Sequence, residues 1–487
     1  MVIYEISARW WLADRDDSSP VDSVPDGPQL ADLRKIGVSH LWLMGAWRTG
    51  PLGTAHARSQ PGLHRELANH LPEATPEDLV GSPFAISGYQ IAHEFGGVDA
   101  LRALREQLAA HEIRLILDFI PNHFGLDHPW LKQHPDRLVA AQPHDDDFVT
   151  VKTRGGRKRF LAHGRDPYFP PWNDTVQIDL RHPETRLALI AELLQIAELC
   201  DGVRCDMAML GLQDIFEQTW HRHPCAVTPA KGEFWAEAIQ AVKAAHPSFS
   251  FIAEAYWGKE SRLLELGFDL VYEKGFLDQL WAHDPPRVQR WLRELPAACL
   301  HRGLRFLENH DEHRAADRFD DAEHRAAAAL TLMLPGAVLL HDGQLQGARV
   351  KSPVQFARRV KEVPQAGIET FYLELLSTLE RLQLRRLPAE LLHPLEAWPG
   401  NHTHQDLIIV LRHAPDSPAY LCVVNLSNHH SQARIPAHGM YLDGITRLRD
   451  ELSGLLVQFG SDLEAQETFF VDLAPYRFHC FRLAQTD

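Results

Sequence analysis

Cysteine is scarce in this chain, and its few cysteines show no metal-binding pattern. No pair has the CxxC spacing, and the six residues are scattered over positions 200, 205, 225, 299, 422 and 480. The 29 histidines include no HExxH motif and no comparable pair four residues apart with a third ligand. We therefore expect reduced thiols, no structural zinc and no catalytic transition metal.

Long hydrophobic runs and an excess of positive charge are also missing. No apolar run approaches the ~20 residues of a membrane-spanning helix, and the N-terminus, MVIYEISARWW, lacks a basic region followed by an apolar stretch. The formal net charge of −16 disfavours nucleic acid and anionic membranes as partners and suits a neutral substrate. We expect a cytoplasmic protein with room for more than one domain in its 487 residues. These features do not predict an oligomeric state.

Polar side chains crowd the end of one short apolar run, RLILDFIPNHF. Residues 115–117 have the continuous hydrophobic character of a buried parallel strand, and Asp118, Asn122 and His123 follow them. In α/β barrels the residues at the C-terminal ends of the strands carry the chemistry. If this strand end belongs to a site, other strand ends should contribute to it.

Three later segments repeat the arrangement. DGVRCDMAML places Arg204 and Asp206 after an apolar stretch, FSFIAEAYW places Glu254, and LRFLENHDEHR places His310 and Asp311. A single Asp after a strand has a simpler explanation, because it is a common helix N-cap or turn residue. Four acids in succession at corresponding positions are poorly explained by coincidence, and they predict one shared site.

The order of the apolar segments predicts the fold. Eight strands alternate with helical stretches, which favours a (β/α)8 TIM barrel. The main helices are expected at residues 29–36, 98–111, 184–199, 234–245, 322–332 and 370–384. From about Pro388, short β-rich segments separated by turn residues predict a small antiparallel β-sandwich. Residues 45–88 and 124–175 show little periodicity, and we expect the first of these stretches to be a lid or binding loop.

The four strand-end motifs resemble, in order and spacing, those of the α-amylase family, glycoside hydrolase family 13. The segments GVSHLWLMG, VQIDL and PGAVLLHDGQ are similar to weaker motifs of that family, so the resemblance runs from Tyr4 to about Gln344. It implies three parts. These are a catalytic barrel at residues 1–123 and 176–387, a short inserted B domain at 124–175, and a C-terminal sandwich at 388–487.

The resemblance also implies roles for the acids. Asp206 would be the nucleophile, Glu254 the general acid/base and Asp311 the transition-state stabiliser of a retaining glycosidase. Retention predicts carboxyl groups of Asp206 and Glu254 about 5–5.5 Å apart, with Glu254 protonated near neutral pH. The residues expected to bind the sugar are Asp118, His123, Arg204, His310, Phe84 and Tyr89. The alternative is a purely structural ion pair between Arg204 and Asp206, with the histidines as buried, satisfied side chains.

Two features bear on the substrate. Family members that act on long chains often have Lys and His three and four residues after the nucleophile, where this chain has Met209 and Leu210. This difference predicts a less polar acceptor side and short α-gluco-oligosaccharides as substrates. Tyr168, Phe169 and Trp172 either pack a proline-rich loop or form a stacking platform for sugar rings.

Calcium is the one candidate metal, and the implied chemistry requires no cofactor. Asn122 stands where the family often binds calcium, and carboxylates of the inserted segment could complete a set of hard oxygen ligands. The candidates are Asp145, Asp146, Asp147 and Asp179. A run of Asp residues is more often a solvated loop.

Three functions remain open at this point. The first is hydrolysis of α-glucosidic bonds through a covalent glycosyl-enzyme. The second is transglycosylation of the glucanotransferase or maltosyltransferase type, which would use the same intermediate. The third is a catalytically inactive sugar-binding barrel, and the intact acids argue against it.

Overall fold

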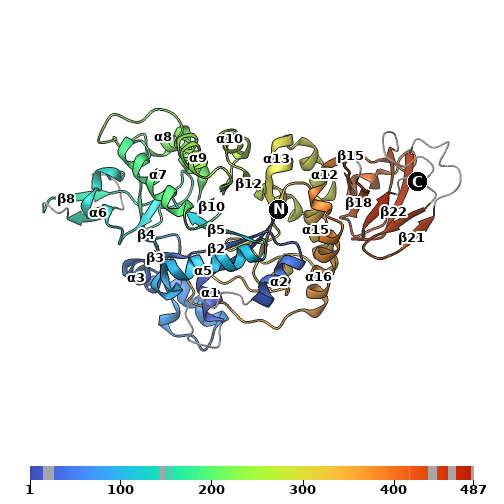
Figure 1. Ribbon diagram of the computed structural model, residues 1–487, viewed down its shortest axis with the longest axis horizontal. Coiled ribbons are helices and arrows are strands. Elements are labelled where there is room, and N and C mark those ends of the chain that lie inside the picture. The colour runs from blue at the N-terminus through green and yellow to red at the C-terminus, as the bar shows by residue number, and fades with distance from the viewer. Residues whose placement is uncertain are drawn as a thin grey trace.

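A computed structural model describes residues 1–14, 27–142, 148–152, 156–415, 417–436, 447–458 and 468–483. Eight parallel strands form a closed barrel at its centre, which confirms the predicted (β/α)8 fold (Figure 1). In the order in which they neighbour one another, the strands are β1 (Val2–Ser7), β14 (Ala337–His341), β13 (Gly303–Arg305), β12 (Leu270–Tyr272), β11 (Ser250–Ala253), β10 (Gly202–Cys205), β5 (Arg114–Phe119) and β2 (His40–Met44).

Alternate side chains of the barrel strands build two separate cores. Ile3, Ile116 and Leu339 belong to the cluster inside the barrel, whereas neighbours such as Val2 and Leu115 belong to the larger cluster outside it. This follows from the period of two along a strand. Because side chains fill the barrel interior, a ligand can reach the strands only at their ends.

Helices cover the outside of the barrel. Six of them lie at or close to the predicted ranges, namely α2 (Gly27–Lys35), α5 (Gly97–Ala110), α7 (Pro183–Ala197), α9 (Phe234–Ala245), α15 (Asp321–Met333) and α16 (Ala366–Arg381). Four further helices follow β11 and β12, namely α10 (Glu260–Glu265), α11 (Lys274–Leu280), α12 (Pro285–Glu294) and α13 (Ala297–Arg302). In the described part of the chain, no helix has the length and apolar character needed to cross a bilayer.

The stretch 45–88 is more ordered than its sequence suggests. It contains β3 (Trp47–Thr49), α3 (Pro51–Ser59), α4 (Pro61–His70) and the start of β4 (Ile86–Ile91), which pairs with β3. Both helices begin with a proline, whose missing N–H costs nothing at the first helical position. Leu67, Leu71 and Leu79 bury against Phe356 in a small cluster of their own. These helices were not apparent from the sequence, because few apolar residues anchor them and their periodicity is weak. A role of this stretch as a lid or binding loop stays a prediction.

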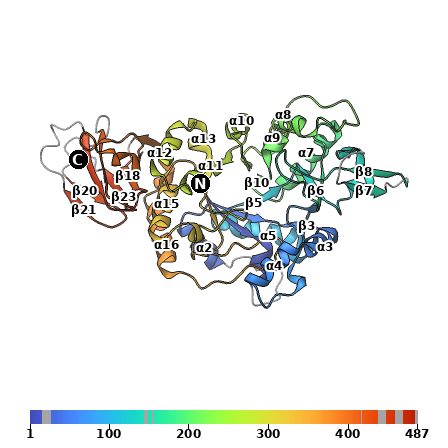
Figure 2. The same ribbon diagram turned by 180° about the vertical axis from the view of Figure 1, so that it is seen from behind.

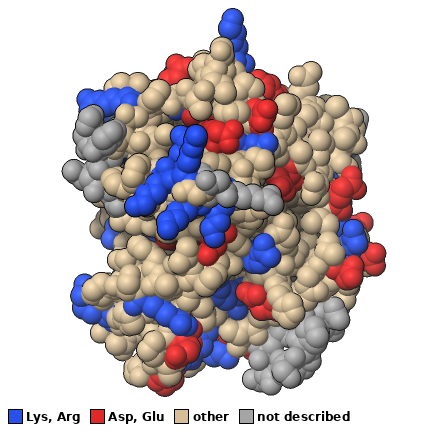
Figure 3. Space-filling view, turned by 90° about the vertical axis from the view of Figure 1, so that its left-hand side faces the viewer, with Lys and Arg blue, Asp and Glu red and all other residues tan. Residues whose placement is uncertain are grey.

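Short antiparallel pairs make up the segment between β5 and α7. The elements are β6 (His123–Gly125), α6 (Trp130–Gln133), β7 (Val149–Lys152), β8 (Lys158–Leu161) and β9 (Thr175–Gln177). β6 pairs with β9, and β7 pairs with β8 to form the β7–β8 hairpin. Residues 153–155 lie outside the described residues. The hairpin carries exposed cations at positions 152 and 157–159, and Lys and Arg gather on the face that this end of the molecule presents (Figure 3).

Two antiparallel sheets form the C-terminal region. One contains β15 (Ala389–Leu392), β17 (Leu407–Arg412), β18 (Ala419–Asn425), β23 (Phe478–Leu483), β20 (Arg447–Asp450) and β21 (Leu456–Gln458). The other contains β16 (Leu395–Glu396), β19 (Ser431–Pro436) and β22 (Thr468–Leu473). Ile409 and Val423 of the first sheet share a core with Ile435 and Val471 of the second. The predicted sandwich is therefore present.

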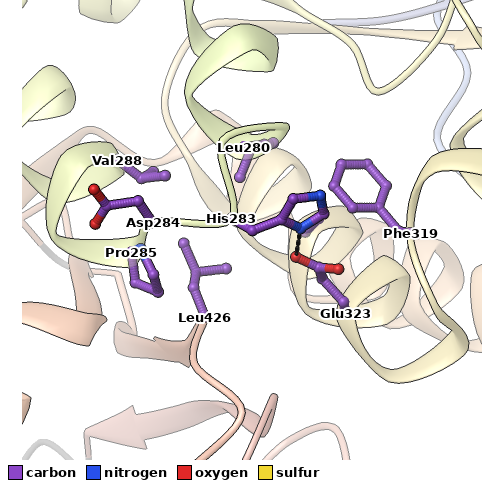
Figure 4. A pocket seen from close by; sticks show the side chains of 9 residues that line it. Leu280, His283, Asp284, Pro285, Val288, Phe319, Glu323 and Leu426 are labelled. Carbon is purple, nitrogen blue, oxygen red and sulfur yellow. Dashed lines mark hydrogen bonds and ion pairs between the residues drawn. The ribbon is translucent and has the colours of Figure 1, made fainter.

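The sandwich packs against the barrel at the end opposite the β7–β8 hairpin (Figure 2). Leu426, just after β18, lies close to Leu280 and Val288 of the barrel helices (Figure 4). Beside them, His283 Nδ1 lies 2.6 Å from Glu323 Oε1. Leu426 and the contacts of β17 and β18 with α12 and α15 place the C-terminal region against this side of the barrel.

Candidate active site

The strand-end motifs meet at one mouth of the barrel. Arg204 on β10 is in register with Asp118 on β5 and Ile252 on β11. Asp206 and Glu254 are the first residues after β10 and β11. Because all eight strands run in parallel, their carboxyl ends share one opening. The structure thus brings together residues that lie far apart in the sequence.

Arg204 joins two of the acids. Its Nη1 lies 2.7 Å from Asp206 Oδ1, and its Nη2 lies 2.8 Å from Glu254 Oε1. Three ring centroids lie 5.2–5.6 Å from the guanidinium carbon, those of Trp42, Phe84 and Tyr272. The Arg204 side chain is 1% exposed. A buried cation between two carboxylates holds both acids at fixed positions beside one another.

Glu254 accepts two further hydrogen bonds. The backbone N–H of Met207 donates to Oε2 at 2.6 Å, and the Tyr256 hydroxyl donates to Oε1 at 2.9 Å. Burial raises the pKa of Glu254 to about 7, although the charge of Arg204 opposes the shift. Glu254 can therefore be protonated close to neutral pH, as a general acid needs to be.

Asp206 has a different environment. Burial also raises the pKa of this carboxyl, but Arg204 opposes the shift through both its charge and a direct hydrogen bond. The Glu254 carboxylate, by contrast, accepts its hydrogen bonds from Tyr256 and Met207. The two acids thus differ in their partners, and Asp206 is the one that the hydrogen bond of Arg204 favours as a carboxylate.

Asp311 is the most open of the three acids. Its side chain is 48% exposed, and Oδ2 lies 2.9 Å from His310 Nε2. Its backbone carbonyl accepts a hydrogen bond from Lys351 Nζ. Burial favours the neutral acid, but the charge of His310 holds the pKa of Asp311 well below its usual range. The negative charge of Asp311 acts on both Asp206 and Glu254.

Glu5 is a buried partner of this group that sequence analysis did not single out. Its Oε1 lies 2.6 Å from His310 Nδ1, and both side chains are completely buried. Burial alone would lower the pKa of His310, but the carboxylates of Asp311 and Glu5 raise it to about 10. His310 is therefore an imidazolium at neutral pH. The sequence of β1 did not indicate a site residue, because Glu5 is a single polar residue in an otherwise ordinary strand.

Asp118 lies beneath the opening of the site. Trp42 Nε1 donates to Oδ1 at 3.0 Å, and the Gly45 N–H donates to Oδ2 at 2.7 Å. The residue is 1% exposed, and burial raises its pKa to about 6. Both carboxylate oxygens hold β2 against β5. Each oxygen can accept a further hydrogen bond, so sugar binding by Asp118 stays a prediction.

Phe84 and His123 line the neighbouring wall. The Phe84 ring stacks on His310 with centroids 5.3 Å apart and an interplanar angle of 28°. The His123 ring lies 5.0 Å from the Trp172 ring, and burial lowers the pKa of His123 to about 4. His123 is therefore neutral and can both donate and accept a hydrogen bond. These placements are compatible with the predicted binding roles.

Tyr89 is not placed to bind a ligand. Its hydroxyl donates to the Ile120 carbonyl at 2.9 Å and accepts from the Ile120 N–H at 3.0 Å. Its ring packs against Trp47, Phe119 and Phe124. The prediction of a binding role for Tyr89 is wrong, because the hydroxyl and the ring are both used in packing behind the site.

The acceptor side also differs from the expectation. Met209 and Leu210 are buried in the core, at 0% and 3% exposure, so they do not line an apolar acceptor site. Tyr168 is 65% exposed and its ring lies 4.9 Å from that of Trp257, three residues after Glu254. Tyr168 was expected either to pack the proline-rich loop or to stack on a sugar, and its exposure leaves it free to stack. The same holds for Phe169, which is 64% exposed.

The expected calcium ligands do not fit a cation as they are arranged. Asn122 Oδ1 accepts a hydrogen bond from Gln177 Nε2 at 3.0 Å, and both carboxylate oxygens of Asp179 pair with Arg181 at 2.8 Å. The described residues contain no group of three or more His, Cys, Asp or Glu that could hold a metal. The candidates at positions 145–147 lie outside the described residues.

Comparison with known proteins supports the same family. The family model described as "Alpha amylase, catalytic domain" matches residues 82–177. "Alpha-amylase MalA" of Haloarcula japonica is 24% identical over 452 residues, which cover 90% of this chain and 57% of that protein. The chain is thus similar to the α-amylase family. The chain spans 57% of the length of that relative and less than a third of the length of several others that it matches.

Relatives with other named activities also match. "Alpha-1,4-glucan:maltose-1-phosphate maltosyltransferase" of Rhodospirillum rubrum is 33% identical over 251 residues, which cover 50% of this chain and 30% of that protein. Among solved structures, a "noncanonic maltogenic alpha-amylase AmyB" from Thermotoga neapolitana has a TM-score of 0.70 at 17% identity, covering 99% of this chain and 98% of that one. This likeness shows a shared fold.

Proposed function

We propose that this α-amylase-family chain is a retaining glycosidase that cleaves α-glucosidic bonds of gluco-oligosaccharides. The observation that carries the proposal is the Arg204 guanidinium, which ion-pairs Asp206 on one nitrogen and Glu254 on the other. Two carboxyl groups on one guanidinium are close enough to act on the same anomeric carbon, and this supports the separation of about 5–5.5 Å that retention requires.

The first step forms a covalent intermediate. Asp206 attacks the anomeric carbon, and its new C–O bond forms as the bond to the leaving sugar breaks. Glu254 gives its proton to the departing glycosidic oxygen, which a pKa of about 7 allows. Positive charge on the ring in the transition state is stabilised by Asp311, whose pKa is held low.

The second step releases the sugar. Glu254, now a carboxylate, takes a proton from water as the water oxygen attacks the anomeric carbon. The bond to Asp206 breaks, and both acids return to their starting states. Two inversions at one carbon give net retention.

We infer that Tyr168 and Trp257 hold the leaving or accepting sugar. Both side chains are exposed, they are in edge-to-face contact, and the segment from Glu254 to Trp257 links them to the general acid. Since Met209 and Leu210 are buried, a preference for short substrates would depend on these exposed rings.

Transglycosylation is a second candidate, favoured by the maltosyltransferases among the relatives. A sugar hydroxyl would then replace water in the second step. Incubation with maltotriose separates the two functions. Products longer than maltotriose indicate transfer, whereas glucose and maltose alone indicate hydrolysis.

Glu254→Gln tests the proposal directly. The amide cannot protonate the leaving oxygen, so maltotriose turnover should fall by about 10²-fold or more. Glu260→Gln is the matched control, because Glu260 is a partly buried acid six residues further along the same segment. It should keep kcat within about twofold. Unchanged turnover in Glu254→Gln would show that Glu254 is not the general acid.

A further inference from the structure

Glu5 is a buried acid for which the reaction above has no step. It lies on β1 in register with Trp42 of β2 and His341 of β14, inside the barrel, and it is 0% exposed. Its Oε1 contacts His310 Nδ1 at 2.6 Å. Among the described residues, its Oε2 has no hydrogen-bond partner. The ion pair with His310 is therefore the main compensation for burying this charge.

His310 is held from both sides. Nδ1 faces Glu5 at 2.6 Å and Nε2 faces Asp311 at 2.9 Å. Two rings confine it, Trp42 edge-on with centroids 5.5 Å apart and Phe84 stacked at 5.3 Å. The imidazole thus has one orientation, set by a carboxylate 305 positions away in the sequence.

We propose that Glu5 is a positioning residue that, through His310, fixes the orientation and the charge of the Asp311 carboxylate. This inference rests on the proposed function, because it assigns Glu5 a part in stabilising the same transition state. Asp311 is half exposed, so its carboxylate needs an internal anchor to stay aimed at the anomeric carbon. Glu5 supplies this anchor through the imidazolium, much as a buried carboxylate orients a catalytic histidine in other enzymes.

The charges around His310 come from several strands. The titratable groups whose charge acts on His310 or on its partner Glu5 are Asp311, Asp118, Asp206, His341 and Tyr272. Burial lowers the pKa of His341 to about 3, so that ring is neutral and does not compete for Glu5. Removing the Glu5 charge should therefore lower the pKa of His310, since one of its two direct carboxylate partners disappears.

The test uses α-glucosyl fluoride as substrate. Fluoride leaves without a proton, so the titration of Glu254 drops out of kcat/KM on the alkaline side. The wild-type value should stay flat from about pH 7 towards the pKa of His310, about 10. In Glu5→Gln it should be about tenfold lower or more at pH 7, and it should decline at least about one pH unit earlier.

Glu273→Gln is the matched control. Glu273 is also a buried carboxylate with a cation 2.6 Å away, here Arg305, but it contacts Trp291 outside the barrel mouth. Its substitution should lower the melting temperature and leave the pH profile as in the wild type. The effect of Glu5→Gln should also vanish in a His310→Ala background, because the two residues act as one unit.

Three results would overturn the inference. They are a wild-type pH profile in folded Glu5→Gln, a loss no larger than in Glu273→Gln, or additivity with His310→Ala. If Glu5→Gln does not fold, Glu5→Asp replaces it, and wild-type kcat/KM in that variant would also contradict the role. A wild-type protein that cleaves no α-glucoside would instead refute the proposed function itself, and this inference with it.

Discussion

At the scale of single residues, Arg204 sets the electrostatics of the site. Its guanidinium is buried between Asp206 and Glu254, and its charge offsets part of the cost of burying both acids. The charge of Arg204 does not fully offset the effect of burial, so the pKa of Glu254 stays raised. Asp206 differs from Glu254 because it also accepts a direct hydrogen bond from Arg204. Two acids of similar intrinsic strength can thereby take different roles in one reaction.

The pH dependence of turnover follows from the raised pKa of Glu254. Glu254 acts first as an acid, so kcat/KM for maltotriose needs its protonated form, which is present below a pKa of about 7 and lost above it. We predict a basic limb near pH 7 with a slope of one proton, measured by initial rates. With α-glucosyl fluoride the same limb should be absent. A limb at the same pH for both substrates would assign it to another group.

Sequence reasoning located most of the site but not its internal supports. The grouping of Asp206, Glu254 and Asp311 was predictable because each follows a short apolar run. Asp206 and Glu254 come directly after β10 and β11, and Asp311 lies six residues after β13. Glu5 was not, since its partner is 305 positions away and contact cannot be read from local pattern. Tyr89 was misjudged for a similar reason, because its buried hydroxyl pairs with the Ile120 backbone.

At the scale of elements, close packing between strands limits what β10 can contain. A Cβ atom on Gly202 would lie 2.6 Å from the Ser250 carbonyl oxygen and 2.8 Å from Ile116 Cδ1. The first contact is with the backbone of neighbouring β11, so it cannot be relieved by rotating a side chain. Glycine at this position therefore keeps the strands that carry Asp206 and Glu254 in register.

Gly202→Ala should accordingly lower the free energy of unfolding by about 1–3 kcal/mol, measured by urea denaturation. Gly62→Ala is the control, because a Cβ there meets nothing within 4 Å in helix α4. That substitution should be neutral or stabilising by up to about 1 kcal/mol. Equal stability of Gly202→Ala and the wild type would contradict the packing account.

Helices and strands were predictable where packing requires apolar residues to recur at a regular spacing along the sequence. Helix α9 coincides with its predicted range because Phe234, Trp235 and Val242 all bury on one face. Helices α3 and α4 escaped prediction because they bury few residues, among them Leu67.

At the scale of the whole molecule, Arg412 ties the sandwich to the barrel. From β17 it donates to the Met333 carbonyl at 2.8 Å, the Leu334 carbonyl at 2.6 Å and the Leu387 carbonyl at 2.9 Å. The residue is 2% exposed. It thus satisfies carbonyl groups at the C-terminal end of α15, which would otherwise be buried without donors.

Arg412→Leu should remove these bonds and lower the free energy of unfolding by about 1–3 kcal/mol for each carbonyl left unpaired. Arg482→Leu, at an exposed position of β23, is the matched control and should change the free energy of unfolding by less than about 0.5 kcal/mol. Thermal melting followed by circular dichroism measures both. Equal melting temperatures of the two variants would show that Arg412 does not stabilise the interface.

The central claim concerns three acids acting on one anomeric carbon, with Asp206 forming the covalent bond. The most direct measurement is mass spectrometry of Glu254→Gln after incubation with α-glucosyl fluoride. This variant can still lose fluoride but lacks the base that releases the sugar. The account predicts an added mass of one glucosyl residue on the peptide that contains Asp206. An adduct on a different acid, or a β-anomer as the first product of the wild-type enzyme, would contradict it.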